Sequence, residues 1–202
     1  LFSANSTELE TAIMGFYPLH PVSTFILPRL SERVAQNERT LFTFLSAEGT
    51  STLRSFIDVY DDDSFNLITP DEIYDYFEPL FKKETFGGEI HDIYLLTSAI
   101  LSSLAVHSLE AKIVKTLSLI YVLEQFERLK PTKDEIVGVY SSSFSVKDIN
   151  AAIDNLIEKE YVIYLKRSND YLRLKQTSGV DIRAKIDDYV ESHSGRTAIK
   201  ET

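Results

Sequence analysis

Cysteine is absent from the 202-residue sequence, which excludes disulfide bonds, thiolate metal sites and a cysteine nucleophile. Every apolar stretch is shorter than the roughly 18 residues that a helix needs to cross a bilayer. No basic and apolar signal sequence opens the chain. We therefore expect a cytoplasmic protein with no membrane partner. Because the sequence starts at Leu1 without an initiator methionine, we interpret it as a piece of a longer protein.

Glycine is scarce, and the phosphate-binding motifs that depend on it are missing. The 7 glycines form no G-x-x-x-x-G-K-[ST] loop and no G-x-G-x-x-G turn, the patterns whose backbone N–H groups hold phosphates. The G-x-S-x-G motif of serine hydrolases is missing too. Because it lacks Walker A and Walker B elements, the chain is predicted to have no catalytic residues and to hydrolyse no nucleotide unaided.

Spacings typical of metal ligands are also missing. The acidic stretch DVYDDDSF lacks the glycine and the final glutamate of an EF-hand loop, so we interpret it as a solvated loop. We expect no metal ion and no cofactor in this chain itself. The histidines form no H-E-x-x-H or H-x-H pattern and are scattered along the sequence: His20, His91, His107 and His193.

Charge divides the chain into two unlike halves. Residues 1–110 contain 6 Lys and Arg against 17 Asp and Glu, whereas residues 111–202 contain 15 against 14. The acidic half repels the phosphates of a nucleic acid. We therefore expect two regions with different surfaces.

Residues 1–110 have helical patterns throughout, and we expect them to form a lid-like helical bundle. The stretch TPDEIYDYFEPLFKKE begins with a threonine cap and a proline in the first helical position, which is a strong helix start. A row of acids follows at helical spacing, made of Asp71, Asp75 and Glu78. We interpret this row as the solvent-facing side of the helix, with acid–base chemistry as the alternative.

Residues 111–177 change character. Three helical stretches are followed by two β-rich segments, YVIYL and YLRLK, which polar turn residues join. This order is typical of a winged helix-turn-helix domain with a small β-hairpin, so the predicted fold class is mainly α. For residues 178–202 we expect a short helix and a mobile tail. The apolar faces predict a winged-helix core made of Ile113, Leu117, Ile120, Ile136, Ile149, Ile153, Leu156, Ile163 and Leu172.

The hairpin is more basic than the third helix of this predicted domain. The outward face of the helix carries three acids against two lysines, which does not suit the major groove of DNA. The hairpin carries four cations that can contact phosphates weakly. Alternatively, these cations only prevent an edge strand from pairing with another chain, which is the interpretation we favour. They are Lys166, Arg167, Arg173 and Lys175.

A polar cluster in the stretch SERVAQNERTLFTFLS precedes a run of apolar and aromatic residues. Arg33 and Gln36 fall on one side of a continuous helix, and Asn37 and Arg39 lie where the next helix begins. An arginine held at a helix start can sense a phosphate through charge-assisted hydrogen bonds. Alternatively, Arg39 caps a neighbouring helix or pairs with a nearby glutamate.

Three sequence blocks occur in a fixed order between residues 15 and 175: YPLHPVSTFILPRLSERVAQNERTLFTFLS, ITPDEIYDYFEPLF and KIVKTLSLIYVLEQFERLKPT. This region resembles the segment that follows the P-loop domain in large bacterial ATPases of the AAA+/signal-transduction type, many of them associated with phage defence. The YP-x-HP and Q-x-x-RT motifs of that family match Tyr17, Pro18, His20, Pro21, Gln36, Arg39 and Thr40.

The resemblance implies a nucleotide-sensing lid followed by a winged-helix output or adaptor module. ATP and Mg²⁺ would be held by the P-loop domain of the same polypeptide. Two functions without a nucleotide stay open: a helical scaffold whose winged helix docks a protein partner, and a regulator with weak nucleic-acid contact. The implied nucleotide-sensing residues are Arg39, Arg33, Gln36, Asn37 and His20.

Overall fold

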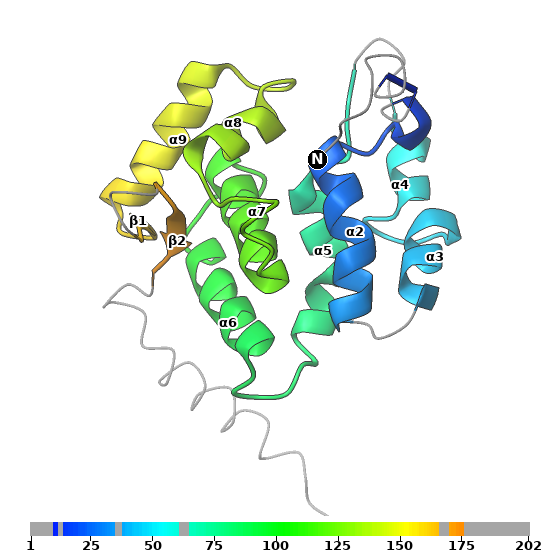
Figure 1. Ribbon diagram of the computed structural model, residues 1–202, viewed down its shortest axis with the longest axis horizontal. Helices are drawn as coiled ribbons and strands as arrows, with labels where there is room; N and C mark the ends of the chain where they lie inside the picture. The colour runs from blue at the N-terminus through cyan, green and yellow to red at the C-terminus, as the bar shows by residue number, and fades with distance from the viewer. Residues whose placement is uncertain (1–9, 12–13, 35–37, 61–64, 166–169, 176–202) are drawn as a thin grey trace, which may run out of the picture.

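The computed structural model describes residues 10–11, 14–34, 38–60, 65–165 and 170–175 (Figure 1). This part of the chain is mainly helical with one small antiparallel hairpin, which confirms the predicted class at that level. None of its helices has the length and apolar content that crossing a membrane requires. The elements are α2 (Pro21–Val34), α3 (Glu38–Ser46), α4 (Leu53–Asp58), α5 (Pro70–Phe81), α6 (Glu89–Leu101), α7 (Leu109–Leu123), α8 (Lys133–Tyr140), α9 (Val146–Glu158), β1 (Val162–Tyr164) and β2 (Leu172–Leu174).

Local sequence signals determine where several helices begin. The side chains of Ser108, Thr132 and Ser145 each accept a hydrogen bond from the backbone N–H three residues further on, and so cap α7, α8 and α9. The helix α5 begins at Pro70, as predicted. The Thr69 hydroxyl does not cap α5 but donates to a carboxylate inside the fold. The sequence pattern thus identified the helix start without identifying what the threonine binds.

The helix α7 lies between the two halves of the fold, with α2 and α5 packed on one side and α9 and β2 on the other (Figure 1). Leu119, Ile120 and Leu123 in its C-terminal half belong to a core built with α2 and α5. Ile113 and Leu117, nearer the N-terminus of α7, belong to a core built with α8, α9 and the hairpin. The predicted division between residues 110 and 111 therefore adjoins a helix that completes both cores.

The hairpin is extended by a short segment that precedes α8. The strands β1 and β2 pair in antiparallel fashion. Beside β2, Thr132 forms an antiparallel bridge with Tyr171. The Leu172 N–H donates to the carbonyl of Pro131, with 2.7 Å between the two atoms. The strand β2 thus pairs with β1 along one edge and with the segment that precedes α8 along the other.

All but one of the residues predicted for the core of this second half are buried, although Ile120 belongs to the core built with α2 and α5. Val162 is buried, whereas Ile163 is half-buried and lies opposite the exposed Arg173. Because side chains alternate between the two faces of a strand, burial of Val162 turns Ile163 outward. Placing Ile163 in the core is therefore wrong. The other predicted core residues are all buried: Ile113, Leu117, Ile120, Ile136, Ile149, Ile153, Leu156 and Leu172.

Replacing a large α7 side chain with alanine in either core should destabilise the whole protein, and the protein should still unfold in a single transition. Leu117 and Ile120 are both buried, but in different cores. We expect Leu117→Ala and Ile120→Ala each to lower the free energy of unfolding by about 2–5 kcal/mol, with a single urea transition in both variants. Val106→Ala, at an exposed position, is the control. Circular dichroism monitors the unfolding in urea. Two separate transitions would show that the two halves unfold independently.

Candidate functional site

The predicted nucleotide-sensing residues lie along α2 and at the start of α3. The backbone of Arg39 is in the first turn of α3, while its side chain lies outside the described structure. Gln36 and Asn37 also lie outside the described residues. His20 directly precedes α2, and Arg33 is in its last turn. Because the 14 residues of α2 span about 21 Å, His20 and Arg33 are at opposite ends of the helix and do not form one site.

Arg33 is engaged by two carboxylates of this chain. Its Nη2 lies 2.6 Å from Glu124 Oε2 and 3.4 Å from Glu89 Oε2. The hydrogen bond with the neighbouring Glu124 carboxyl raises the pKa of Glu89, while the hydrogen bond from Arg33 lowers the pKa of Glu124. Glu124 ends α7 in a left-handed conformation, with φ 54°. Arg33 therefore joins the end of α2 to the start of α6 and the end of α7.

His20 connects the start of α2 to α8. Its Nδ1 accepts a hydrogen bond from the Val22 backbone N–H at 3.1 Å, and its other ring nitrogen donates to the Gly138 carbonyl. Burial lowers the pKa of His20, so the neutral ring is favoured. Both ring nitrogens thus have partners inside the chain, and His20 has a structural role at the junction of the two halves.

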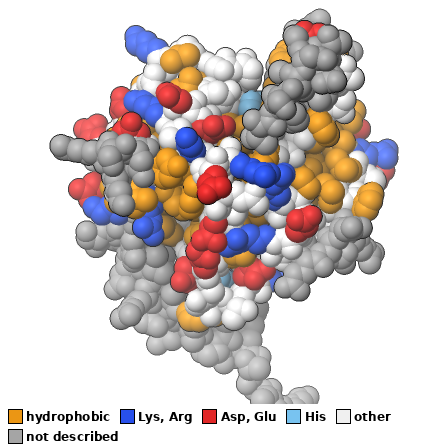
Figure 2. Space-filling view, in the orientation of Figure 1, with side chains coloured by type: hydrophobic (Ala, Val, Ile, Leu, Met, Phe, Trp, Pro, Cys, Tyr) orange, Lys and Arg blue, Asp and Glu red, His pale blue; other side chains and the backbone are white. Residues whose placement is uncertain are grey.

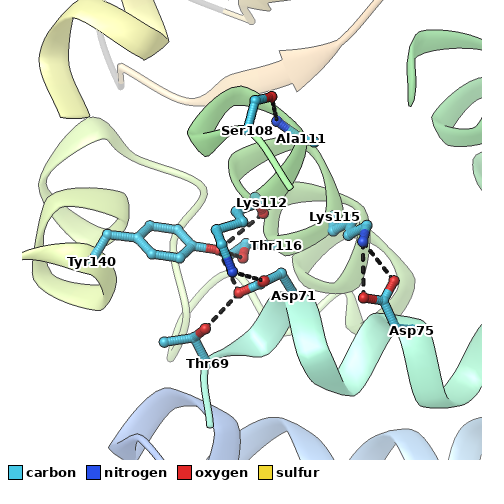
Figure 3. A network of polar contacts seen from close by, with 9 residues as sticks. All are labelled: Thr69, Asp71, Asp75, Ser108, Ala111, Lys112, Lys115, Thr116 and Tyr140. Carbon is cyan, nitrogen blue, oxygen red and sulfur yellow. Dashed lines mark hydrogen bonds and ion pairs between the residues drawn. The ribbon is translucent and has the colours of Figure 1, made fainter. Parts of the chain in front are cut away.

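A buried carboxylate holds α5, α7 and α8 together (Figure 3). Asp71, in the first turn of α5, is only 3% exposed. Its Oδ2 lies 2.7 Å from Lys112 Nζ, and its Oδ1 accepts hydrogen bonds from the hydroxyls of Thr69 at 2.5 Å and Tyr140 at 3.1 Å. The Tyr140 hydroxyl also lies 2.7 Å from that of Thr116. A buried charge needs such partners, because an uncompensated one strongly destabilises the fold.

This network corrects the interpretation of the acidic row on α5. Asp71 is buried, and Asp75 pairs with Lys115 at 2.6 Å. The prediction that these acids face solvent is therefore wrong for Asp71 and only partly correct for Asp75. Figure 2 shows acidic and basic side chains lying next to one another along the middle of this face of the molecule. The sequence contained a signal for this pairing. Lys112 and Lys115, three residues apart, interrupt the largely apolar helix α7. Their spacing matches that of Asp71 and Asp75, four residues apart on α5.

A cavity of about 250 Å³ opens beside the Asp71 network. Aromatic side chains of Phe56, Tyr60 and Phe144 form part of its wall, and Glu72 and Lys112 supply charged groups. Burial, and secondarily the neighbouring Asp71 carboxylate, raise the pKa of Glu72 to about 7. Glu72 is therefore partly protonated at neutral pH.

The predicted basic hairpin is only partly described. Lys166 and Arg167 lie outside the described residues. Arg173 is exposed on β2, and Lys175 Nζ pairs with Glu160 at 2.7 Å. Exposed acids are present on α9 as predicted: Asp148, Asp154 and Glu158.

In the described part of the chain, the polar side chains of this region connect helices to one another. No group of three His, Asp or Glu side chains in the described ranges is arranged to hold a metal ion. The charged groups instead form ion pairs that connect α2, α5, α6 and α7, and the hydrogen bond from Tyr140 to Asp71 adds α8 to them. The sequence had singled out His20 and Arg33 as nucleotide-sensing residues, not as contacts between helices, and it gave no such role to Asp71, Lys112 or Tyr140.

No protein-family model matches the sequence, and neither a curated protein nor a solved structure is significantly similar to the chain. A function must therefore be inferred from this geometry together with the sequence motifs.

Removal of the cation beside Asp71 should destabilise the protein strongly. Lys112→Met keeps the length of the side chain but leaves a buried carboxylate without a counter-ion, and we expect the free energy of unfolding to fall by about 3 kcal/mol. Lys133→Met breaks the more exposed pair with Asp154, and should cost less than about 1 kcal/mol. Urea unfolding measures both. Adding Asp71→Asn to Lys112→Met should recover part of the loss; equal losses for both lysines would contradict the role of this pair.

Protonation of Glu72 should make stability depend on pH. Its folded-state pKa of about 7 exceeds the ordinary value of 4.5, so the folded state binds more protons, and stability falls as pH rises through this window. Glu72→Gln cannot ionise, and at pH 8 we expect it to be more stable than the wild type by on the order of 1 kcal/mol. Glu127→Gln, at an exposed position, is the control.

The test is the difference in unfolding free energy between Glu72→Gln and the wild type, measured from pH 4 to pH 8. A difference that stays constant over this range would show that Glu72 titrates normally.

Proposed function

We propose that α7, α8, α9 and the hairpin form a winged helix. The support comes from the antiparallel bridge between Thr132 and Tyr171. This bridge marks a short strand at Thr132, between α7 and α8. That strand pairs with β2, so β2 lies between the short strand and β1. The sequence of helix, short strand, two helices and hairpin is the arrangement expected of a winged helix-turn-helix domain.

The chain as a whole then acts as a non-catalytic lid and output module of a larger bacterial ATP-binding protein, of the type associated with phage defence. The observation that carries this proposal is the sharing of α7 by both hydrophobic cores. Polar links reinforce it near both ends of α7, through Asp71 to Lys112 and through Arg33 to Glu124. A displacement of the lid helices is therefore passed to the hairpin as a rigid-body movement.

Arg39 is the residue that senses the nucleotide in this proposal. It belongs to the Q-x-x-RT motif and lies in the first turn of α3. The backbone next to it is fixed, because the Tyr76 hydroxyl donates to the Thr40 carbonyl at 3.1 Å and the Phe44 ring is buried. A fixed helix start suits an arginine that reaches a phosphate held by a preceding P-loop domain, which also holds Mg²⁺. His20 and Arg33 position the helices, since each is bonded within the chain.

Replacing Arg39 should affect ATP turnover and not stability. In the full-length protein we expect Arg39→Ala to lower turnover about tenfold or more. Arg39→Lys should rescue it poorly, because a point charge does not reproduce the two-pronged guanidinium contact. Arg54→Ala removes another arginine, which pairs with Glu48 at an exposed position, and serves as the matched control with normal turnover.

The melting temperatures of the same variants complete this test. An Arg39→Ala protein with a lowered melting temperature and normal turnover would overturn the nucleotide-sensing role. It would favour the second candidate, a scaffold whose winged helix docks another protein. The exposed Asp148, Asp154 and Glu158 on α9 favour such a protein partner over DNA, because they repel phosphates.

A further inference from the structure

A groove of about 680 Å³ lies between α6, the end of α7 and the hairpin. Apolar and aromatic side chains make up most of its lining. One of them, Leu165, is 40% exposed, so part of the groove presents an apolar surface to solvent. These lining residues are Ile93, Leu96, Tyr121, Phe126, Leu165 and Leu174.

The two sides of the groove differ in charge. On the side of α6 and the end of α7 it is lined by Glu89, Asp92 and Glu124, with Arg33 as the cation that pairs with two of them. On the hairpin side it is lined by Arg173. The acidic side suits a partner with a basic residue at one edge of its apolar face.

Such a partner follows the hairpin in the same chain. The sequence VDIRAKIDDYVESH, residues 180–193, has its larger apolar side chains, after the first residue Val180, at Ile182, Ile186, Tyr189 and Val190. This spacing predicts one apolar face of a helix. On a helical projection Arg183 and Lys185 flank that face, one on each side, and the acids lie opposite: Asp181, Asp187, Asp188 and Glu191.

We propose that residues 180–193 dock into this groove as an amphipathic helix, with Ile182, Ile186 and Tyr189 facing the apolar lining. A helix of this length extends about 21 Å, which matches the 13 residues of α6. A helix so short is only marginally stable alone in water, so its apolar face needs a surface to pack against. The groove supplies that surface.

The connection is short enough for docking within one molecule. Leu174 lines the groove, and the docking segment begins only a few residues after it. The four residues 176–179 reach at most about 14 Å, which keeps residue 180 close to the groove. The docked helix holds the hairpin against α6. This proposal needs no nucleotide and is independent of the function proposed for Arg39.

Disulfide trapping in the 202-residue chain tests the proposal, because the sequence has no cysteine of its own. Ile93→Cys places a thiol in the groove, and it is combined in turn with Ile182→Cys, Ile186→Cys or Tyr189→Cys. Ile93→Cys with Asp188→Cys is the matched control, since residue 188 lies on the opposite face of the predicted helix. Circular dichroism of the reduced proteins verifies that each variant is folded.

We expect at least one of the three apolar-face pairs to form an intramolecular disulfide about tenfold or more faster than the control pair, because docking raises the effective concentration of only one face. Adding Leu165→Asp should slow that reaction by damaging the groove. Equal rates for both faces, or no disulfide in any pair, would overturn the proposal. Disulfides between two molecules, increasing with protein concentration, would show instead that a second copy fills the groove.

Discussion

The burial of the Asp71 carboxylate is the constraint on which the arrangement of the helices depends. Among the described residues it is the one acid that is fully buried, and it needs donors from several directions to offset the loss of water. Lys112, Tyr140 and Thr69 supply them from α7, α8 and the segment before α5. Because the donors come from elements distant in sequence, satisfying this charge fixes α5, α7 and α8 relative to one another, and the two hydrophobic cores form around the fixed helices.

Much of the fold could be predicted because its signals are local. The caps at Ser108, Thr132 and Ser145 and the proline at the start of α5 are read within one turn of helix. The apolar faces of α7 and α9 follow from residue spacing. What could not be predicted depends on tertiary contacts. In the short, largely apolar strand VIY, spacing alone did not determine which face is buried, and the pairing with β2 decided it.

The candidate site was predicted less completely, for a related reason. The sequence singled out His20 and Arg33 as nucleotide-sensing residues but did not indicate what they bind, because their partners Gly138 and Glu124 lie 118 and 91 residues further along the chain. The same separation hid the Asp71–Lys112 pair, even though the spacing of its acids and lysines was visible. A charged residue in a largely apolar helix, such as Lys112 in α7, was the signal of a buried partner.

The sharing of α7 by both cores also limits how this region can evolve. Modules that are exchanged between proteins by recombination usually have their own core and a boundary that few contacts cross. A boundary beside α7 has neither property here, because removing the first half would expose Leu119, Ile120 and Leu123. Removing the second half would take α7 with it and open the remaining core. The helical bundle and the segment that follows it are therefore expected to be inherited together, as a single unit of recombination.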